Sequence, residues 1–321
     1  MKVGIIGLPQ TGKKTLFQIL TGNQITDPAK AFKPVPGAAD ILDSRFDKLT
    51  DMYSPKKNVR ARIDLVLLPK MEAETISKGD IFKDIADMDA ICHVIRAFED
   101  DAIYHSEGSV DASRDYEMVN SELILHDQIF VEKRIERLTA MVKKIKDEDQ
   151  QRELELMNRL KAHLEEEKPL RLFSLTGDEQ KMIRSYPFIT LKKLVIAVNV
   201  SETDLENEGI FSWFDQHCRA DEVHFMLVSA KVESEIAMLD TEAEKLEFLQ
   251  DLGITATALE SLTRLCLESL NLISFFTVGS DEVRQWLVRK DSRAPQAAGV
   301  IHSDLERGFI RAEVFKYDEL M

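Results

Sequence analysis

The chain has 321 residues, which is enough for two or three domains, and 44% of them are hydrophobic, as is usual in a globular protein. It carries 57 acidic and 42 basic side chains, and the formal charge of −15 argues against strong non-specific binding to nucleic acid or to an anionic membrane. Three scattered cysteines, no signal-peptide pattern and no apolar run near the ~20 residues of a membrane helix predict a cytoplasmic protein with reduced thiols and no membrane partner.

The first predicted element is a buried strand over residues 2–6, followed by the loop "GLPQTGKK" and by an amphipathic helix from Lys13. Gly7, Gly12 and Lys13 have the spacing G-x-x-x-x-G-K of a phosphate-binding loop, in which backbone N–H groups and the lysine hold the phosphates. That pattern continues with a Ser or Thr that binds Mg²⁺, but this chain has Lys14 there. Because strand and helix flank the loop as the motif requires, we predict a nucleotide-binding set of Gly7, Leu8, Pro9, Gln10, Thr11, Gly12, Lys13, Lys14 and Thr15. The alternative is a strand-to-helix turn without a ligand.

Further apolar runs predict an α/β fold with a doubly wound, mostly parallel sheet. Residues 90–95, 194–200 and 224–230 are nearly continuous apolar runs, as expected for strands buried on both faces. Residues 61–68 are more mixed and predict an edge strand. Ligands of such sheets bind at the carboxyl ends of strands, where Asn199 and Ser229 also lie.

Between residues 111 and 169 the apolar spacing changes to that of a helical hairpin inserted in the sheet domain. Apolar residues recur at sevens, fours and threes on both sides of the charged residues 146–151: Ile124, Val131, Ile135, Leu138, Val142 and Ile145, then Met157, Leu160 and Leu164. This pattern predicts two antiparallel helices with a coiled-coil-like seam. The charges indicate a solvated arm, and a partner-binding role stays open.

Several segments together resemble the YchF family, which are Obg-related P-loop NTPases with a helical insertion and a C-terminal TGS (ubiquitin-like) domain. Residues 7–22, 89–100, 121–138, 199–202 and 229–240 are similar to family motifs, and the most specific likeness is in residues 272–315. The resemblance implies a P-loop domain of residues 1–112 and 190–270, an inserted hairpin domain of residues 113–189, and a TGS-like segment of residues 271–321. We expect that segment to be a truncated TGS domain, because the chain stops at Met321 before the family's last strands.

The resemblance also implies ATP binding in preference to GTP, slow hydrolysis, and association with ribosomes or stress-response factors through the hairpin or the TGS-like segment. The residues that match the family's base-recognition motifs are Asn199, Val200, Glu202, Ser229, Ala230 and Lys231. Asn199 is expected to face the base edge. GTP-specific relatives have an Asp that accepts both guanine N–H donors where this chain has the longer Glu202, so that contact should be lost.

The departures from the family pattern concern the metal and the γ-phosphate. Besides Lys14, the family's D-x-x-G motif appears here as "DLVL", which keeps Asp64 as a candidate metal ligand but has Leu67 in place of the glycine. The threonine that the family has in the preceding segment is replaced by Ala31. Phosphoryl transfer depends on these groups, so we expect weak or absent hydrolysis, no identifiable catalytic residue and a doubtful requirement for Mg²⁺. One hypothesis is that the Lys14 ammonium supplies part of the missing metal charge. The alternatives are that Lys14 points into solvent, or that two adjacent lysines without a metal leave the site empty.

Two classes of function follow from these observations. The first is an adenine-nucleotide-binding regulatory protein, which the intact Gly7, Gly12, Lys13, Asn199 and Glu202 favour. The alternative is a nucleotide-free pseudo-NTPase that acts as an interaction scaffold. An active NTPase with an unusual metal site is a third reading, against which Lys14 and Leu67 argue.

Overall fold

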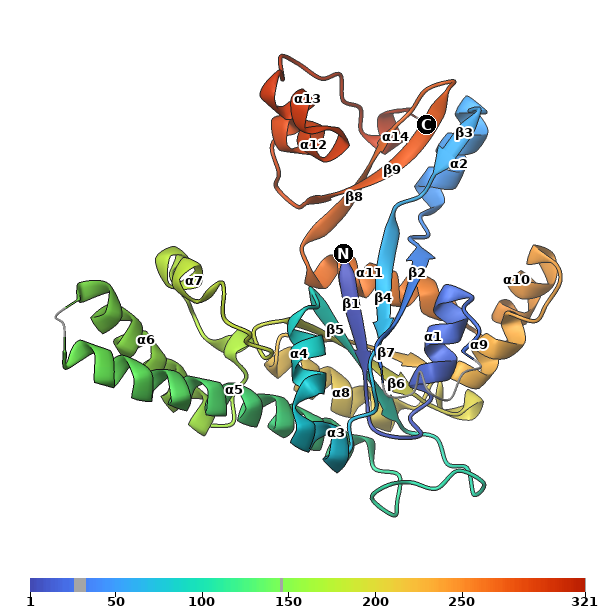
Figure 1. Ribbon diagram of the computed structural model, residues 1–321. Coiled ribbons are helices and arrows are strands. Elements are labelled where there is room, and N and C mark those ends of the chain that lie inside the picture. Colours follow the sequence, from blue (N-terminus) through green and yellow to red (C-terminus); the bar gives the residue numbers. More distant parts are fainter. Residues whose placement is uncertain (26–32, 145–146, 321) are drawn as a thin grey trace. The chain divides into compact units, whose positions relative to one another are not determined.

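The computed structural model describes residues 1–25, 33–144 and 147–320 (Figure 1). Two compact units are present: a sheet unit made of Lys2–Gly37 and Leu65–Asp240, and a second unit made of Met1, Ala38–Asp64 and Thr241–Met321. Ala31 and Ile145 lie outside the described residues. The division into three domains by sequence stays a prediction.

The sheet unit is built on a six-stranded sheet with the order β2-β4-β1-β5-β6-β7. The strands are β1 Lys2–Ile6, β2 Val35–Asp40, β4 Arg62–Leu67, β5 Ala90–Arg96, β6 Lys193–Asn199 and β7 His224–Val228. The neighbours β1 and β5, β5 and β6, and β6 and β7 are parallel. The predicted α/β fold with a mostly parallel sheet is therefore confirmed.

Residues 61–68 do contain a strand, but the prediction of an edge strand is wrong. Strand β4 lies between β2 and β1, and β2 forms the edge. The sequence of β2, VPGAAD, has no apolar run and includes Pro36 and Gly37, so it does not look like a strand. Proline is tolerated at sheet edges because a missing N–H donor there faces no partner strand.

Helices cover the sheet, and their apolar residues form its core. They are α1 Lys13–Thr21, α3 Ala73–Lys78, α4 Asp80–Ala86, α8 Glu208–Ala220 and α9 Ala230–Ile236. One core cluster joins Ile91 of β5 and Ile196 of β6 to Phe82 of α4 and Phe214 of α8. This packing fixes the strands whose carboxyl ends carry the candidate site.

The predicted helical hairpin is present as α5 Ala112–Val142 and α6 Glu148–Glu165, followed by α7 Gly177–Ile183 (Figure 1). Val131 and Leu138 of α5 pack with Met157 and Leu160 of α6 in one buried cluster, as the apolar spacing predicts. Buried Asp127 ties the hairpin to the chain before β6 by accepting hydrogen bonds from the backbone N–H of Ile189 and Thr190. No helix in the described ranges has the length and hydrophobicity needed to cross a bilayer.

The second unit contains a three-stranded sheet with the order β3-β9-β8. Its elements are α2 Ser44–Tyr53, β3 Lys57–Val59, α10 Glu242–Asp251, α11 Ala258–Ser269, β8 Leu272–Thr277, β9 Glu282–Arg289, α12 Ala294–Ile301, α13 Ser303–Arg307 and α14 Tyr317–Leu320. Strands β8 and β9 are antiparallel, whereas β3 joins β9 in parallel from a distant part of the chain.

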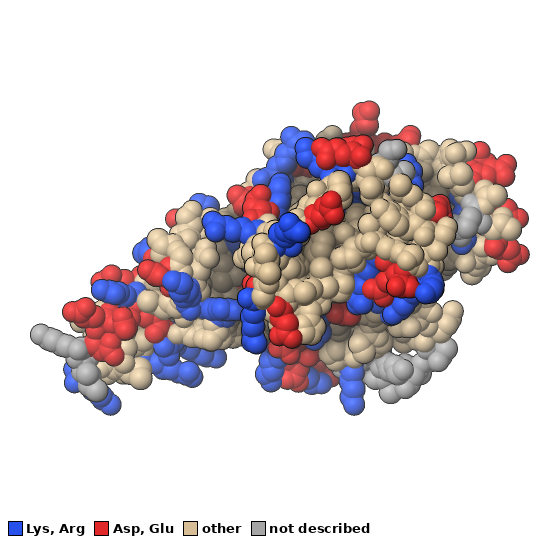
Figure 2. All heavy atoms as spheres, turned by 90° about the horizontal axis from the view of Figure 1, so that it is seen from above, with Lys and Arg blue, Asp and Glu red and all other residues tan. Residues whose placement is uncertain are grey.

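Figure 2 shows acidic and basic side chains mixed over the face that it draws.

Candidate nucleotide-binding site

The loop between β1 and α1 has a shape that depends on its two glycines. At Gly12 the backbone φ is 85°, and a Cβ there would collide with Nδ2 of Asn199 on β6. At Gly7 a Cβ would lie 2.5 Å from the carbonyl oxygen of Val94 on β5. A side chain at either position would force the loop away from these strands. The loop therefore lies against two parallel strands at the edge where α/β sheets bind ligands.

The other predicted loop residues differ in exposure. Leu8 and Thr11 are buried, Pro9 and Lys13 are half-buried, and Gln10, Lys14 and Thr15 are exposed. Thr11 Oγ1 donates a hydrogen bond of 3.2 Å to the carbonyl of Leu8, which closes the loop on itself. Lys14 and Thr15 lie in the first turn of α1.

Asn199, the last residue of β6, connects the loop to the segment that follows β7. Its Nδ2 donates to the carbonyl of Thr11 at 3.0 Å, and its Oδ1 accepts from the backbone N–H of Ala230 at 2.9 Å. The residue is 4% exposed, so main-chain groups engage both ends of the amide. This side chain fixes the spacing between the loop and α9, and its contact with a base stays a prediction.

Lys13 is held at the loop by two main-chain carbonyls. Its Nζ donates to Gly7 at 3.1 Å and to Pro69 at 2.8 Å. Burial and, to a lesser extent, the Lys70 ammonium lower the pKa of Lys13 to about 7, and the Glu72 carboxylate opposes this shift. A nearby anion favours the charged form of an amine. Phosphate binding would therefore protonate Lys13.

His93 of β5 is a core residue. Burial, together with the charge of Lys13, lowers the pKa of His93 to about 3. The imidazole is therefore neutral throughout the physiological pH range, and it is 2% exposed. It offers no cation to a ligand at the loop.

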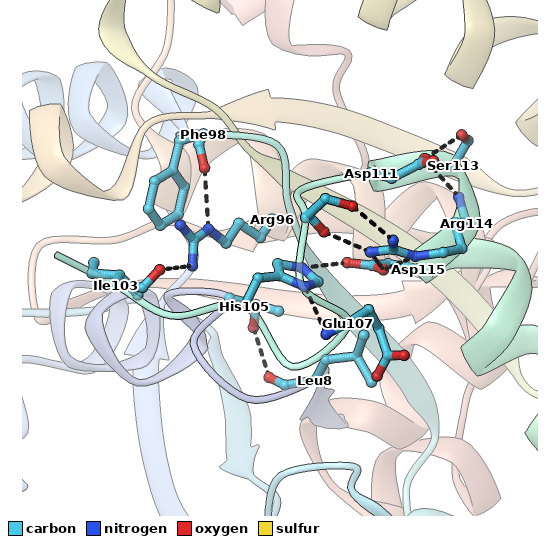
Figure 3. A network of polar contacts seen from close by, with 12 residues as sticks. Leu8, Arg96, Phe98, Ile103, His105, Glu107, Asp111, Ser113, Arg114 and Asp115 are labelled. Atoms are coloured by element: carbon cyan, nitrogen blue, oxygen red, sulfur yellow. Dashed lines mark hydrogen bonds and ion pairs between the residues drawn. The ribbon is translucent and has the colours of Figure 1, made fainter. Parts of the chain in front are cut away.

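A second polar network lies beside the loop and holds the chain that follows β5 (Figure 3). The buried Arg96 donates to the carbonyls of Phe98 and Ile103, both at 3.1 Å. Nε2 of His105 lies 2.9 Å from Oδ2 of the buried Asp115, and Figure 3 places His105 beside Leu8 of the loop.

Arg114 contacts the other oxygen of Asp115 at 2.8 Å, so this carboxylate joins the connecting chain to the start of α5. The motifs in the sequence did not predict this network. The one available signal is an arginine directly at the end of the buried strand β5.

The residues predicted to recognise the base are only partly brought together. Ser229 and Ala230 are buried at the start of α9, where Oγ of Ser229 caps the helix by accepting from Val232 N at 3.5 Å. Val200 is buried beside Asn199, and its N–H donates to Val228. Glu202 and Lys231 are exposed, and Glu202 begins a short 3-10 helix, Glu202–Asp204.

The structure does not bring Asp64 to the loop. The backbone N–H of Asp64 donates to Met1, at the start of β1, whereas Met71 N donates to the carbonyl of Gly7 in the loop itself. Asp64 therefore pairs beside the start of β1, and Pro69 reaches the loop instead. The candidate ligands do not fit Mg²⁺, because Lys14 stands where the loop pattern has a hydroxyl ligand and the ammonium of Lys13 is held at the loop.

A loop with two indispensable glycines and a buried lysine, at the carboxyl edge of a parallel sheet, defines the class of P-loop NTPases. The ribosome-binding ATPase YchF of Bacillus subtilis (strain 168) is 38% identical over 333 residues, which cover all of this chain and 90% of that protein. Obg-like ATPase 1 of Oryza sativa subsp. indica is 35% identical over 335 residues, covering all of this chain and 83% of that protein.

The solved structure of the Schizosaccharomyces pombe YchF GTPase matches with a TM-score of 0.82 and 31% identity, over all of this chain and 89% of that chain. The family model YchF-GTPase_C, described as a protein of unknown function (DUF933), matches residues 272–321. The chain belongs to the YchF family, as its motifs indicate.

Proposed function

We propose that the chain binds a purine nucleotide, ATP in preference to GTP, through the loop Gly7–Lys13. The observation that carries this proposal is the environment of Lys13. Its amine is buried, has a lowered pKa, and donates to two neutral carbonyls, and no ion pair to an acidic side chain involves it in the described part of the chain. An amine in this setting gains most from an anion that replaces the carbonyls.

Hydrolysis is proposed to be weak or absent. After β4, Pro69 and Met71 are hydrogen-bonded to the loop residues Lys13 and Gly7, with Lys70 between them, and none of these three is a glycine or a carboxylate. Metal charge and positioning of the attacking water supply most of the rate in phosphoryl transfer. A chain that lacks these groups would bind nucleotide as a regulatory factor rather than turn it over rapidly.

The preference for ATP rests on Glu202. Its carboxylate is exposed at the start of the 3-10 helix, and the neighbouring Asp204 is occupied, because it accepts hydrogen bonds from Ser201 and Asn207. Guanine recognition needs a carboxylate that accepts two N–H donors at once. We therefore propose adenine binding, with Asn199 and residues 229–231 around the base.

Two relatives are named for nucleotide hydrolysis, and one of them for ribosome binding, which supports a regulatory or ribosome-associated role for this chain. We place the partner contact on the hairpin, residues 113–189, or on the TGS-like residues 271–321. The nucleotide domain is then formed by residues 1–112 and 190–270.

Calorimetric titration with ATP, ADP and GTP, each with Mg²⁺ and with EDTA, tests the proposal. Binding of ATP at micromolar concentration that survives EDTA is expected, together with its loss in Lys13→Met, which keeps the chain length but removes the charge. Lys181→Met on α7, where Lys181 is exposed, is the matched control and should bind as the parent protein does. If no nucleotide binds in any condition, the chain is a scaffold in which carbonyls satisfy Lys13.

A further inference from the structure

The segment that follows β4 is hydrogen-bonded to the phosphate loop through the residues on both sides of Lys70. On one side, the carbonyl of Pro69 accepts a hydrogen bond of 2.8 Å from Nζ of Lys13. On the other, the backbone N–H of Met71 donates to the carbonyl of Gly7 at 3.1 Å. The main chain of Lys70 is therefore fixed beside the loop by its two sequence neighbours.

Lys70 itself has a fixed backbone and an ion pair with Glu72. Its carbonyl accepts a hydrogen bond of 2.6 Å from Oγ1 of Thr75 in α3. Its Nζ lies 3.1 Å from Oε2 of Glu72, and the lysine side chain is 39% exposed. A solvent-accessible pair of this kind is weak, so an incoming anion of higher charge can displace the carboxylate.

The charges that act on Lys13 identify which cation is its neighbour. Lys70 lowers the pKa of Lys13 and Glu72 raises it, whereas Lys14 is not among the causes of the shift. Two ammonium groups that repel each other gain when an anion lies between them. Lys70 therefore has a charge that acts on Lys13 and a main chain that its sequence neighbours hold beside the loop.

We propose that Lys70 is a phosphate-binding residue which, with Lys13, provides the positive charge that a divalent ion provides in related loops. The ligand class is a nucleoside di- or triphosphate without a bound divalent cation, and Lys70 leaves Glu72 when it contacts the phosphates. This inference rests on the nucleotide binding proposed above. It explains why the site tolerates the loss of Ser at position 14: a metal ion would be repelled by the cation already there.

Titration calorimetry with ADP and ATP on four proteins tests the role of Lys70. Wild type should have the same Kd within about threefold in Mg²⁺ and in EDTA, because the lysines supply the charge. Lys70→Ala should raise the Kd at least about tenfold in both conditions, and Glu72→Gln, which frees Lys70, should lower it about two- to threefold. Lys78→Ala, in an exposed pair with Glu74 on α3, is the matched control and should match wild type. Equal melting temperatures of the two lysine variants would show that folding is unaffected.

Two results overturn the inference while nucleotide binding stands. One is Lys70→Ala binding as wild type does while Lys13→Met does not bind. The other is wild-type affinity that rises about tenfold or more with Mg²⁺, since a metal would then fill the place assigned to Lys70. A wild type that binds neither nucleotide overturns both this inference and the proposed function. The set of variants therefore separates the two failures.

Discussion

Nucleotide binding at the loop should be coupled to the uptake of a proton, because burial and Lys70 lower the pKa of Lys13 to about 7. Before binding, the amine is about 10% protonated at pH 8 and about 90% protonated at pH 6, by the ordinary titration relation. Phosphate oxygens in contact with Nζ favour the ammonium and move its pKa back towards the usual value of a lysine. Binding should therefore take up about 0.9 protons at pH 8 and about 0.1 at pH 6.

The same titration sets the pH dependence of affinity. Only the protonated amine pairs with phosphate, so the apparent affinity should be about tenfold weaker at pH 8 than at pH 6. The sign follows from the direction of the shift: a cation whose pKa is lowered in the protein loses its charge as pH rises through 7. A lysine with an ordinary pKa would show no change over this range.

Calorimetry in two buffers with different ionisation enthalpies measures the protons taken up per nucleotide. Lys13→Arg is the control, because a guanidinium stays charged at both pH values and the nucleotide's own titration is unchanged. The difference between the two proteins at pH 8 should be about 0.9 protons. Equal proton numbers at pH 8 would refute the assignment of Lys13 as the titrating phosphate ligand.

Three further variants test how the site and the hairpin are built. Asn199→Ala removes the acceptor of the buried Ala230 N–H and the donor to the carbonyl of Thr11. It should lower the free energy of unfolding, measured by urea titration, by about 1–3 kcal/mol. An unchanged midpoint would contradict a structural role of Asn199 between the loop and α9. Gly12→Ala places a Cβ against Asn199 and should abolish calorimetric binding of ATP, whereas normal affinity would mean that the loop relaxes at little cost. Leu138→Ala in the hairpin core should lower the free energy of unfolding in a urea titration by about 2–5 kcal/mol. The calorimetric affinity for ATP should stay unchanged. A parallel loss of affinity would show that the hairpin and the loop are coupled.

Apolar patterns predicted the elements whose burial is two-sided or strictly periodic. Residues 90–95 and 194–200 are continuous apolar runs because strands in the middle of a parallel sheet are covered on both faces. The hairpin was equally visible, because a seam between two helices requires apolar residues at fixed spacing. Strands β2 and β3 were missed for the opposite reason, since their places are set by pairing with distant strands rather than by their own composition.

The site was predicted as far as its chemistry is local. Gly7, Gly12 and Lys13 are neighbours in sequence, so the motif carries their geometry with it. Asp64 and Lys70 depend instead on the register between β4 and β1, which hydrogen bonds far apart in the chain decide. Because the register places Met71 rather than Asp64 beside Gly7, the motif match at Asp64 did not identify the segment that reaches the loop.

The charge of the whole chain and the charge of the site have opposite signs, and this difference bears on what the site can hold. The formal charge is −15, yet Lys13 and Lys70 are the cations assigned to the loop, with Glu72 as the ionic partner of Lys70. Electrostatic interactions through water fade beyond about 8–10 Å at physiological salt, so a small anion at the loop is governed by these lysines. A long polyanion would also extend over acidic surface and be repelled there. The arrangement therefore favours a compact, highly charged ligand such as a nucleotide over a stretch of nucleic acid.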